Sequence, residues 1–258
     1  MGFIERIKSD KMRIATGLAL LAVVLIVGFF NNIWVIGAFL SVVFVVALHE
    51  AIALYDLRDR TSLYIVAIVL WAAALFYPYP LELLFVALLI CAASAAFSKA
   101  NDLRSALVIL YPTAPMVFLF LLYREFGIGA FVWLVVAVIA CDVGAYYAGK
   151  LLGKTPFSPS SPSKTLEGVV GGVTAGTVLG TMAGLQFDFG FWATAAISLA
   201  VSVGSVFGDL FESYLKRQAG VKDSGHILPG HGGALDRIDG YLFAAVVLLV
   251  SFHLFSWQ

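Results

Sequence analysis

The sequence contains little charge, little cysteine and no excess of one charge sign. Only 12% of its 258 residues are Asp, Glu, Lys or Arg, whereas soluble domains carry about 25%, so an ordinary soluble fold is excluded. The 16 basic and 16 acidic residues balance, and no basic tail is present, so no feature favours binding to nucleic acid. The two cysteines, Cys91 and Cys141, lie in apolar stretches without metal-ligand spacing and are interpreted as small buried residues.

The sequence is instead rich in long apolar blocks. Hydrophobic residues make up 61% of the chain, in runs such as 14–30 and 33–48. A helix needs about 20 residues to cross about 30 Å of hydrocarbon, so these runs predict an all-α, polytopic integral membrane protein. The basic segment 1–13 before the first run resembles a signal peptide. That run is too long and further spans follow, so we expect it to remain as the first transmembrane helix.

Breaks at charges, prolines and turn residues predict nine membrane-spanning helices. Pro78 and Pro80 separate the third helix from the fourth. Three further prolines, with the serines around them, predict a loop at 155–163. The expected helices are 13–30, 32–57, 62–77, 81–98, 103–123, 128–151, 165–185, 191–218 and 233–255. We divide them into N-terminal spans 1–5 (residues 1–126) and C-terminal catalytic spans 6–9 with their loops (residues 127–258), together one membrane unit.

The basic residues give this topology an orientation. With nine spans, Arg124 alone falls on one side, and every other Lys and Arg falls on the side of the N-terminus. Basic loops remain in the cytoplasm. We therefore expect a cytoplasmic N-terminus and cytoplasmic active-site loops, with the C-terminus on the opposite face.

Three patterns resemble functional motifs and are interpreted otherwise. Glycine recurs every fourth residue from Gly168 to Gly184, which predicts close helix packing rather than a phosphate loop. The string at 148–155 nearly matches a P-loop, but Ala148 replaces its first glycine and no strand precedes it. His49 and Glu50 begin an HExxH-like string, but Ala53 stands where the second histidine would be, so no zinc site is expected.

Carboxylates near the predicted helix ends carry the functional signal. A charge at the centre of a membrane helix costs about 2.5–3.5 kcal/mol, so a group of them needs an explanation. Asp142 lies near the end of the sixth span. Asp209, Glu212, Ser213 and Lys216 share one face of the eighth. Asp236 and Asp239 are one turn apart on the last span. Isolated interfacial salt bridges would explain one pair, but the convergence of so many charges favours function.

The connecting loops add groups that bind phosphate. By the predicted topology, the loop at 150–164 and the glycine-rich loop at 218–233 lie at the same membrane face. Ser163, Lys164 and Thr165 begin the seventh span, where a helix N-terminus favours anions. Carboxylates from two helices, without thiolates or clustered histidines, favour Mg²⁺ over Zn²⁺.

Two stretches resemble one enzyme family. Residues 213–239 fit S-x-x-K-R-x(4)-K-D-x(5)-P-x-H-G-G-x-x-D-R-x-D, which is similar to the signature of phosphatidate cytidylyltransferases, also called CDP-diacylglycerol synthases. Residues 142–149, DVGAYYAG, and 161–168, SPSKTLEG, also resemble that family. Ser163 stands where the family usually has a basic residue. The matching motifs cover 142–239, and the first five spans match only in general character.

The resemblance implies transfer of CMP from CTP to phosphatidic acid in phospholipid biosynthesis, giving CDP-diacylglycerol and pyrophosphate. It implies Mg²⁺, with room for a second cation, and a location in a bacterial inner membrane. Asp209 and Asp236 become the first metal ligands, with Asp142, Asp239 and Glu212 as second choices, and Lys216 and Asp239 join the two aspartates as catalytic residues. The implied substrate-binding residues are Asp142, Ser163, Lys164, Thr165, Glu212, Ser213, Arg217, Lys222, Asp223, His231, Gly232, Gly233 and Arg237.

Two other functions remain open at this point. A CTP-dependent polyprenol or dolichol kinase would move the γ-phosphate and release CDP instead of pyrophosphate. A cation or phosphate transporter would also use intramembrane carboxylates, but the charges gather at one face and no inverted repeat is found. The DGxxAR pattern of CDP-alcohol phosphotransferases is not found either. The glycine row could serve a homodimer as well as packing within one chain.

Overall fold

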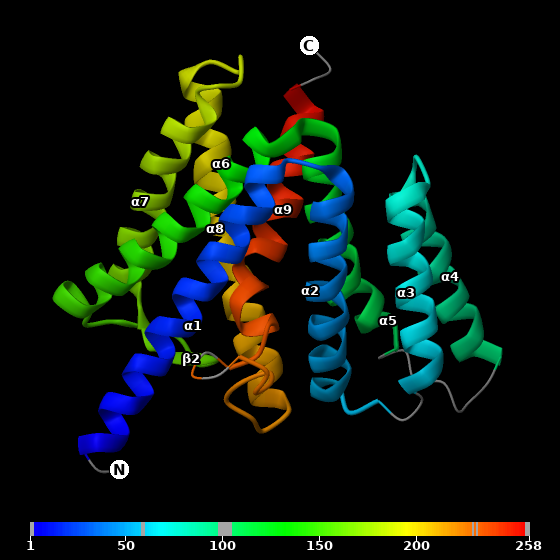
Figure 1. Ribbon diagram of the computed structural model, residues 1–258, viewed down its shortest axis with the longest axis horizontal. Coiled ribbons are helices and arrows are strands. Elements are labelled where there is room, and N and C mark those ends of the chain that lie inside the picture. Colours follow the sequence, from blue (N-terminus) through cyan, green and yellow to red (C-terminus); the bar gives the residue numbers. More distant parts are fainter. Residues whose placement is uncertain (1–2, 58–59, 98–104, 229, 231, 256–258) are drawn as a thin grey trace. The chain divides into compact units, whose positions relative to one another are not determined.

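The computed structural model describes residues 3–57, 60–97, 105–228, 230 and 232–255, and these residues are mostly helical (Figure 1). The chain divides into two compact units, each formed from two segments of sequence. The first unit contains residues 1–114 and 219–237, and the second contains 115–218 and 238–258. The predicted functional division at residue 126 stays a prediction.

The first unit contains the N-terminal helices. These are α1 (Phe3–Phe30), α2 (Ile33–Leu54), α3 (Arg60–Phe76), α4 (Pro80–Phe97), the single turn α5 (Ser105–Val108) and the π-helical turn η1 (Ile109–Thr113). Asn32 caps α2, because its side-chain oxygen accepts the Trp34 N–H at 2.9 Å. Pro80 opens α4 at the position where a missing N–H costs nothing.

The second unit contains α6 (Ala114–Leu152, from its second residue), β1 (Pro156–Ser158), β2 (Ser161–Thr165), α7 (Leu166–Gly184), α8 (Phe191–Gln218) and most of α9 (Leu235–Phe255). Gly127 interrupts α6 with φ 75° and ψ −169°, a conformation that glycine adopts without a Cβ clash. This break lies between the two helices predicted at 103–123 and 128–151. They follow each other directly, with Gly127 as the interruption.

The row of glycines on α7 packs inside the second unit, as predicted. The buried residues of α7 are Gly168, Gly172, Gly176, Gly180, Thr181 and Gly184. A Cβ on Gly176 would lie 2.9 Å from the Ala137 carbonyl oxygen of α6, and one on Gly180 would lie 3.2 Å from Ser198 of α8. The glycines thus let α7 approach both neighbouring helices.

Several helices are long and apolar enough to cross a membrane, as expected of an integral membrane protein. Within the described residues six helical stretches meet this standard, and Ala15–Phe30 and Thr61–Phe76 are shorter apolar helices. The predicted count of nine spans is not confirmed. Part of the difference comes from Ser105–Leu152, a stretch of 48 residues that counts once although Gly127 breaks it between the two predicted helices.

The predicted loop at 155–163 was wrong in part, because β1 and β2 form an antiparallel hairpin there. Pro156 pairs with Thr165, and Ser158 pairs with Ser161. Proline has no backbone N–H to donate, but at the edge of a two-stranded hairpin the missing hydrogen bond is tolerated. Thr165 ends the hairpin and caps α7, since its hydroxyl oxygen accepts the Gly168 N–H at 3.2 Å.

Candidate active site

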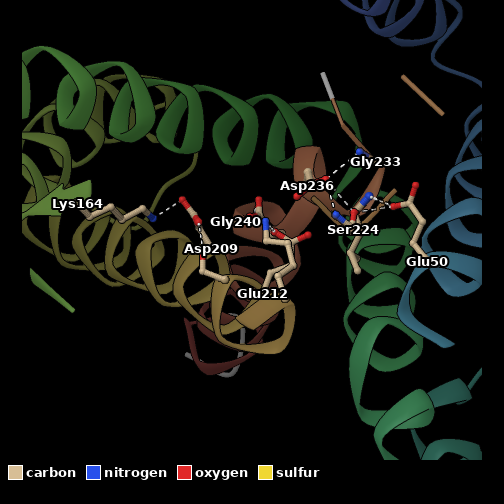
Figure 2. Close-up of polar contacts among 12 residues, drawn as sticks. Glu50, Lys164, Asp209, Glu212, Ser224, Gly233, Asp236 and Gly240 are labelled. Atoms are coloured by element: carbon tan, nitrogen blue, oxygen red, sulfur yellow. Dashed lines mark hydrogen bonds and ion pairs between the residues drawn. The ribbon is translucent and has the colours of Figure 1, made fainter. Parts of the chain in front are cut away.

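A lysine of the hairpin forms an ion pair with a carboxylate of α8. Lys164 lies on β2, and its ammonium group donates to Asp209 Oδ2 (Figure 2). The side chains are 27% and 34% exposed, so the pair remains accessible to solvent or ligand. Ser213, one turn after Asp209, donates its hydroxyl to Asp209 Oδ1 at 3.4 Å. These contacts bring together residues from both motifs that the sequence singled out.

The next turn of α8 holds a buried ion pair. Lys216 Nζ lies 2.8 Å from Glu212 Oε2, and the Glu212 side chain is 0% exposed. The spacing of four residues places both side chains on one face of the helix. A buried carboxylate without a cation would be costly, so Lys216 stabilises the charge on Glu212.

A third carboxyl group of the second unit approaches Glu212. Asp239, on α9, lies near Glu212, and its Oδ1 accepts the Gly240 N–H at 2.8 Å. Gly208 makes this approach possible, because its missing side chain leaves room for the Asp239 backbone. Two neighbouring carboxyl groups repel each other when both are charged, and a proton or a cation between them removes this repulsion.

The carboxylates of the second unit are the candidate ligands for a hard divalent cation. Asp209, Glu212 and Asp239 offer carboxylate oxygens, which Mg²⁺ prefers, and the second unit places lysines rather than thiolates beside them. In the described part of the chain, no group of three or more His, Cys, Asp or Glu side chains is arranged as a metal site. Asp209 belongs to the second unit and Asp236 to the first. Their use as joint ligands stays a prediction.

The glycine-rich loop of the first unit is organised around Asp236. One oxygen of this carboxylate, Oδ2, accepts three hydrogen bonds, from the Gly233 N–H at 2.8 Å and from the Ser224 N–H and hydroxyl at 2.9 Å each. Three donors on one oxygen fix the plane of the carboxylate. They also close the loop between 224 and 233 against the first turn of α9.

Glu50 binds the same loop from α2. Its Oε1 accepts the Ala234 N–H at 3.0 Å, and its Oε2 accepts the Leu235 N–H at 2.8 Å and the Ser224 hydroxyl at 2.9 Å. Figure 2 shows the carboxylate directed toward Ser224 and Gly233. Glu50 is 2% exposed, so these donors, at the positive end of α9, offset the cost of burying its charge.

Two glycines of the loop leave the space that Glu50 fills. A Cβ on Gly225 or on Gly233 would collide with the Glu50 carboxylate. Gly232 has φ 80°, a conformation that few other residues adopt, and a Cβ there would lie 2.8 Å from Asp236 Oδ2. The glycine content of the loop therefore reflects close contact with carboxylates.

The remaining predicted residues are distributed over both units. In the second unit, Asp142 on α6, Ser163 on β2 and Arg217 on α8 are exposed. In the first, Lys222, Asp223 and Arg237 are exposed around the loop. His231 lies outside the described residues. The contacts above bring Lys164, Asp209, Glu212, Ser213, Lys216 and Asp239 together, and separately bring Gly233 to Asp236. The substrate-binding roles of all these residues stay predictions.

The sequence interpretation missed Glu50, Ser224 and Glu167. Glu167, in the first turn of α7, accepts the Lys154 N–H at 3.0 Å and the Thr155 N–H at 3.1 Å, and so holds the start of the hairpin. Glu50 was set aside with the incomplete HExxH-like string. Its isolated charge in an otherwise apolar helix was the available signal.

Comparison with known proteins identifies the family. The model of the cytidylyltransferase family matches residues 11–255, which is most of the chain. The chain belongs to the cytidylyltransferase family. Among its relatives, the phosphatidate cytidylyltransferase of Helicobacter pylori (strain ATCC 700392 / 26695) is 42% identical over 245 residues, covering 95% of this chain and 92% of that protein. The phosphatidate cytidylyltransferase of Thermotoga maritima is 31% identical over 233 residues, covering 83% and 86%.

The second unit thus places lysines beside carboxylates in a chain of the cytidylyltransferase family. Lysine side chains can bind the phosphates of a nucleoside triphosphate and stabilise the negative charge that shifts among them during transfer. The matched region also includes α2, so Glu50 belongs to the part of the chain that is similar to the family.

Proposed function

We propose that this chain is a phosphatidate cytidylyltransferase, which transfers CMP from CTP to phosphatidic acid and releases pyrophosphate. The observation that carries this proposal is the 42% identity to an enzyme of that name over 95% of the chain. The lysine and carboxylate cluster of the second unit supports it, because charge neutralisation is the main requirement of such a transfer.

The carboxylates would hold Mg²⁺. Asp209 is our first ligand, with Glu212 and Asp239 beside it in the second unit. Asp236 and Asp142 complete the ligand set carried over from the family resemblance. A bound divalent cation supplies charge neutralisation at the phosphates. The number of carboxylates in this cluster is our reason for proposing a second cation as well.

The basic residues would bind and orient the phosphates. The Lys164 side chain is partly exposed, so its ammonium group can leave Asp209 and bind a triphosphate oxygen instead. Lys216, Arg217, Lys222 and Arg237 are the other candidates. A phosphate oxygen of phosphatidic acid attacks the α-phosphorus of CTP, a new P–O bond forms, and the bond to the β-phosphate breaks, so pyrophosphate leaves. Holding both substrates in line supplies much of the acceleration.

The placement in the membrane follows from the basic residues. We propose an integral protein of a bacterial inner membrane, with the N-terminus and the loops that bear Lys164 and Asp236 in the cytoplasm and the C-terminus outside. CTP would then reach the site from the cytoplasm, and the lipid would reach it from the bilayer.

Two labels on CTP test the reaction. Purified protein in detergent, with Mg²⁺ and phosphatidic acid, should transfer label from the α-phosphate of CTP to lipid and release pyrophosphate. Transfer of the γ-label to a polyprenol would instead identify a kinase. Chelation with EDTA should stop the transfer, and added Mg²⁺ should restore it. If neither label reaches lipid while the protein remains folded, the proposal is wrong.

A further inference from the structure

Glu50 is separated from its partners by a long stretch of sequence and yet contacts the loop that precedes Asp236. It lies 184 residues before Ala234, whose N–H it accepts. It belongs to α2, whereas the other residues proposed for the site lie at or after Asp142. The first unit contains Glu50, the loop and Asp236 together.

We propose that Glu50 is a positioning residue of the transferase site, which shapes the loop 224–235 and, through Ser224, orients Asp236. This inference rests on the proposed function for its catalytic consequence, but its structural part does not. Glu50 is not placed in contact with substrate.

The hydroxyl of Ser224 lies between the two carboxylates and shares its single proton between them. Its oxygen lies 2.9 Å from Glu50 Oε2 and 2.9 Å from Asp236 Oδ2. The Ser224 N–H also donates to Asp236 Oδ2 at 2.9 Å, so movement of Ser224 changes two contacts of that oxygen at once. Glu50 thereby restrains the orientation of Asp236 without touching it.

Glu50 also fixes the start of α9. The first N–H groups of a helix have no partner within the helix, and Glu50 accepts two of them, from Ala234 and Leu235. Asp236 follows directly, so its backbone position depends on the same contact. Gly225 and Gly233 lie against the Glu50 carboxylate, so the loop packs around it on both sides.

Glutamine is the sharpest substitution because it keeps the size of the side chain. Glu50→Gln replaces one acceptor oxygen with an NH₂ group, which must then face a backbone or hydroxyl donor. Ser224→Ala is a second, milder variant that removes only the connecting hydroxyl and keeps the Ser224 N–H.

Tyr55→Phe is the matched control. The Tyr55 hydroxyl donates to the Tyr111 carbonyl at 2.9 Å in the same unit, and burial raises its pKa above the ordinary value, so it stays a donor. Its loss removes a buried hydrogen bond without changing a contact of Glu50, Ser224 or Asp236.

Amide hydrogen exchange, measured by mass spectrometry on full-length protein in detergent, tests the structural part. In Glu50→Gln we expect peptides covering 223–236 to exchange about 10-fold faster, and in Ser224→Ala a few-fold faster. Peptides of α8 should be unchanged. Tyr55→Phe should leave the loop as in the wild type. Unchanged protection of the loop in Glu50→Gln, or equal loosening in Tyr55→Phe, would overturn the inference.

Kinetics test the catalytic part on the same samples. We expect kcat of Glu50→Gln to fall about 100-fold, as for misplaced catalytic groups, with KM for CTP changed less than about threefold. Tyr55→Phe should retain kcat. If the activity of Glu50→Gln falls only in proportion to the fraction of protein that is unfolded, the inference is overturned. If the wild type transfers no cytidylyl group, the proposed function fails, while hydrogen exchange still decides whether Glu50 holds the loop.

Discussion

Lys164 of the β-hairpin and Asp209 of α8 form an ion pair that joins two motifs 45 residues apart. Both side chains are partly exposed, so the pair adds less than about 1 kcal/mol to stability. Its value is the placement of a cation beside a carboxylate. Activity and stability should therefore respond differently to its removal.

Lys164→Ala should lower kcat/KM for CTP by about 100-fold, because it removes a charge that binds the triphosphate. The melting temperature should change by only a few degrees, as expected for an exposed pair. Asp209→Asn should abolish transfer. Lys154→Ala is the control, since Lys154 is exposed and contacts Glu167 through its backbone N–H, which alanine keeps. Equal losses in both lysine variants would contradict a specific role for Lys164.

Lys216→Met should destabilise the protein by about 3 kcal/mol, because it leaves the buried Glu212 carboxylate without its cation. Thermal unfolding in detergent measures the effect. The double variant Glu212→Gln/Lys216→Met should recover most of the loss, since no buried charge remains. A double variant as unstable as the sum of the single variants would mean that the two side chains do not act as a pair.

Gly176→Ala should lower the melting temperature, because the new methyl group would meet Ser202 and lie 2.9 Å from the Ala137 carbonyl oxygen. Overpacking of this kind costs about 1–3 kcal/mol. Gly149→Ala on α6 is the matched control, since its methyl group would come no closer than 3.3 Å to any side chain or neighbouring backbone. The close packing of α7 would be contradicted if both variants unfolded at the wild-type temperature.

Glu167→Gln should weaken the attachment of the hairpin to α7. The carboxylate accepts two backbone N–H groups and the Thr155 hydroxyl, the last at 2.8 Å, and glutamine replaces these charge-assisted hydrogen bonds with weaker neutral ones. We expect faster hydrogen exchange at 154–165 and a kcat/KM reduced about 10-fold, because Lys164 lies on that hairpin. Thr155→Val removes only the hydroxyl contact and should give a smaller change. Unchanged exchange in Glu167→Gln would show that the hairpin is held by other contacts.

The sequence located the parts of the site that lie close together along the chain. The spacing of Asp209, Glu212, Ser213 and Lys216 predicted one helical face, and the structure places all four on α8, with Lys216 bonded to Glu212. Asp209 is bonded to Lys164 of the hairpin, a partner outside this helix. Helix geometry determines which side chains four residues apart can meet. It does not determine which of several nearby basic residues pairs with each carboxylate.

The apolar helices, the close packing of the glycine row, the break between residues 123 and 128 and the family could all be predicted from the amino-acid sequence, because each depends on local periodicity or on a contiguous motif. The hairpin formed by β1 and β2 and the contact of Glu50 with the loop before α9 appear only in the folded chain. Local pattern does not encode these features. A contact between residues 185 positions apart arises only when folding brings a buried carboxylate to backbone donors that need an acceptor.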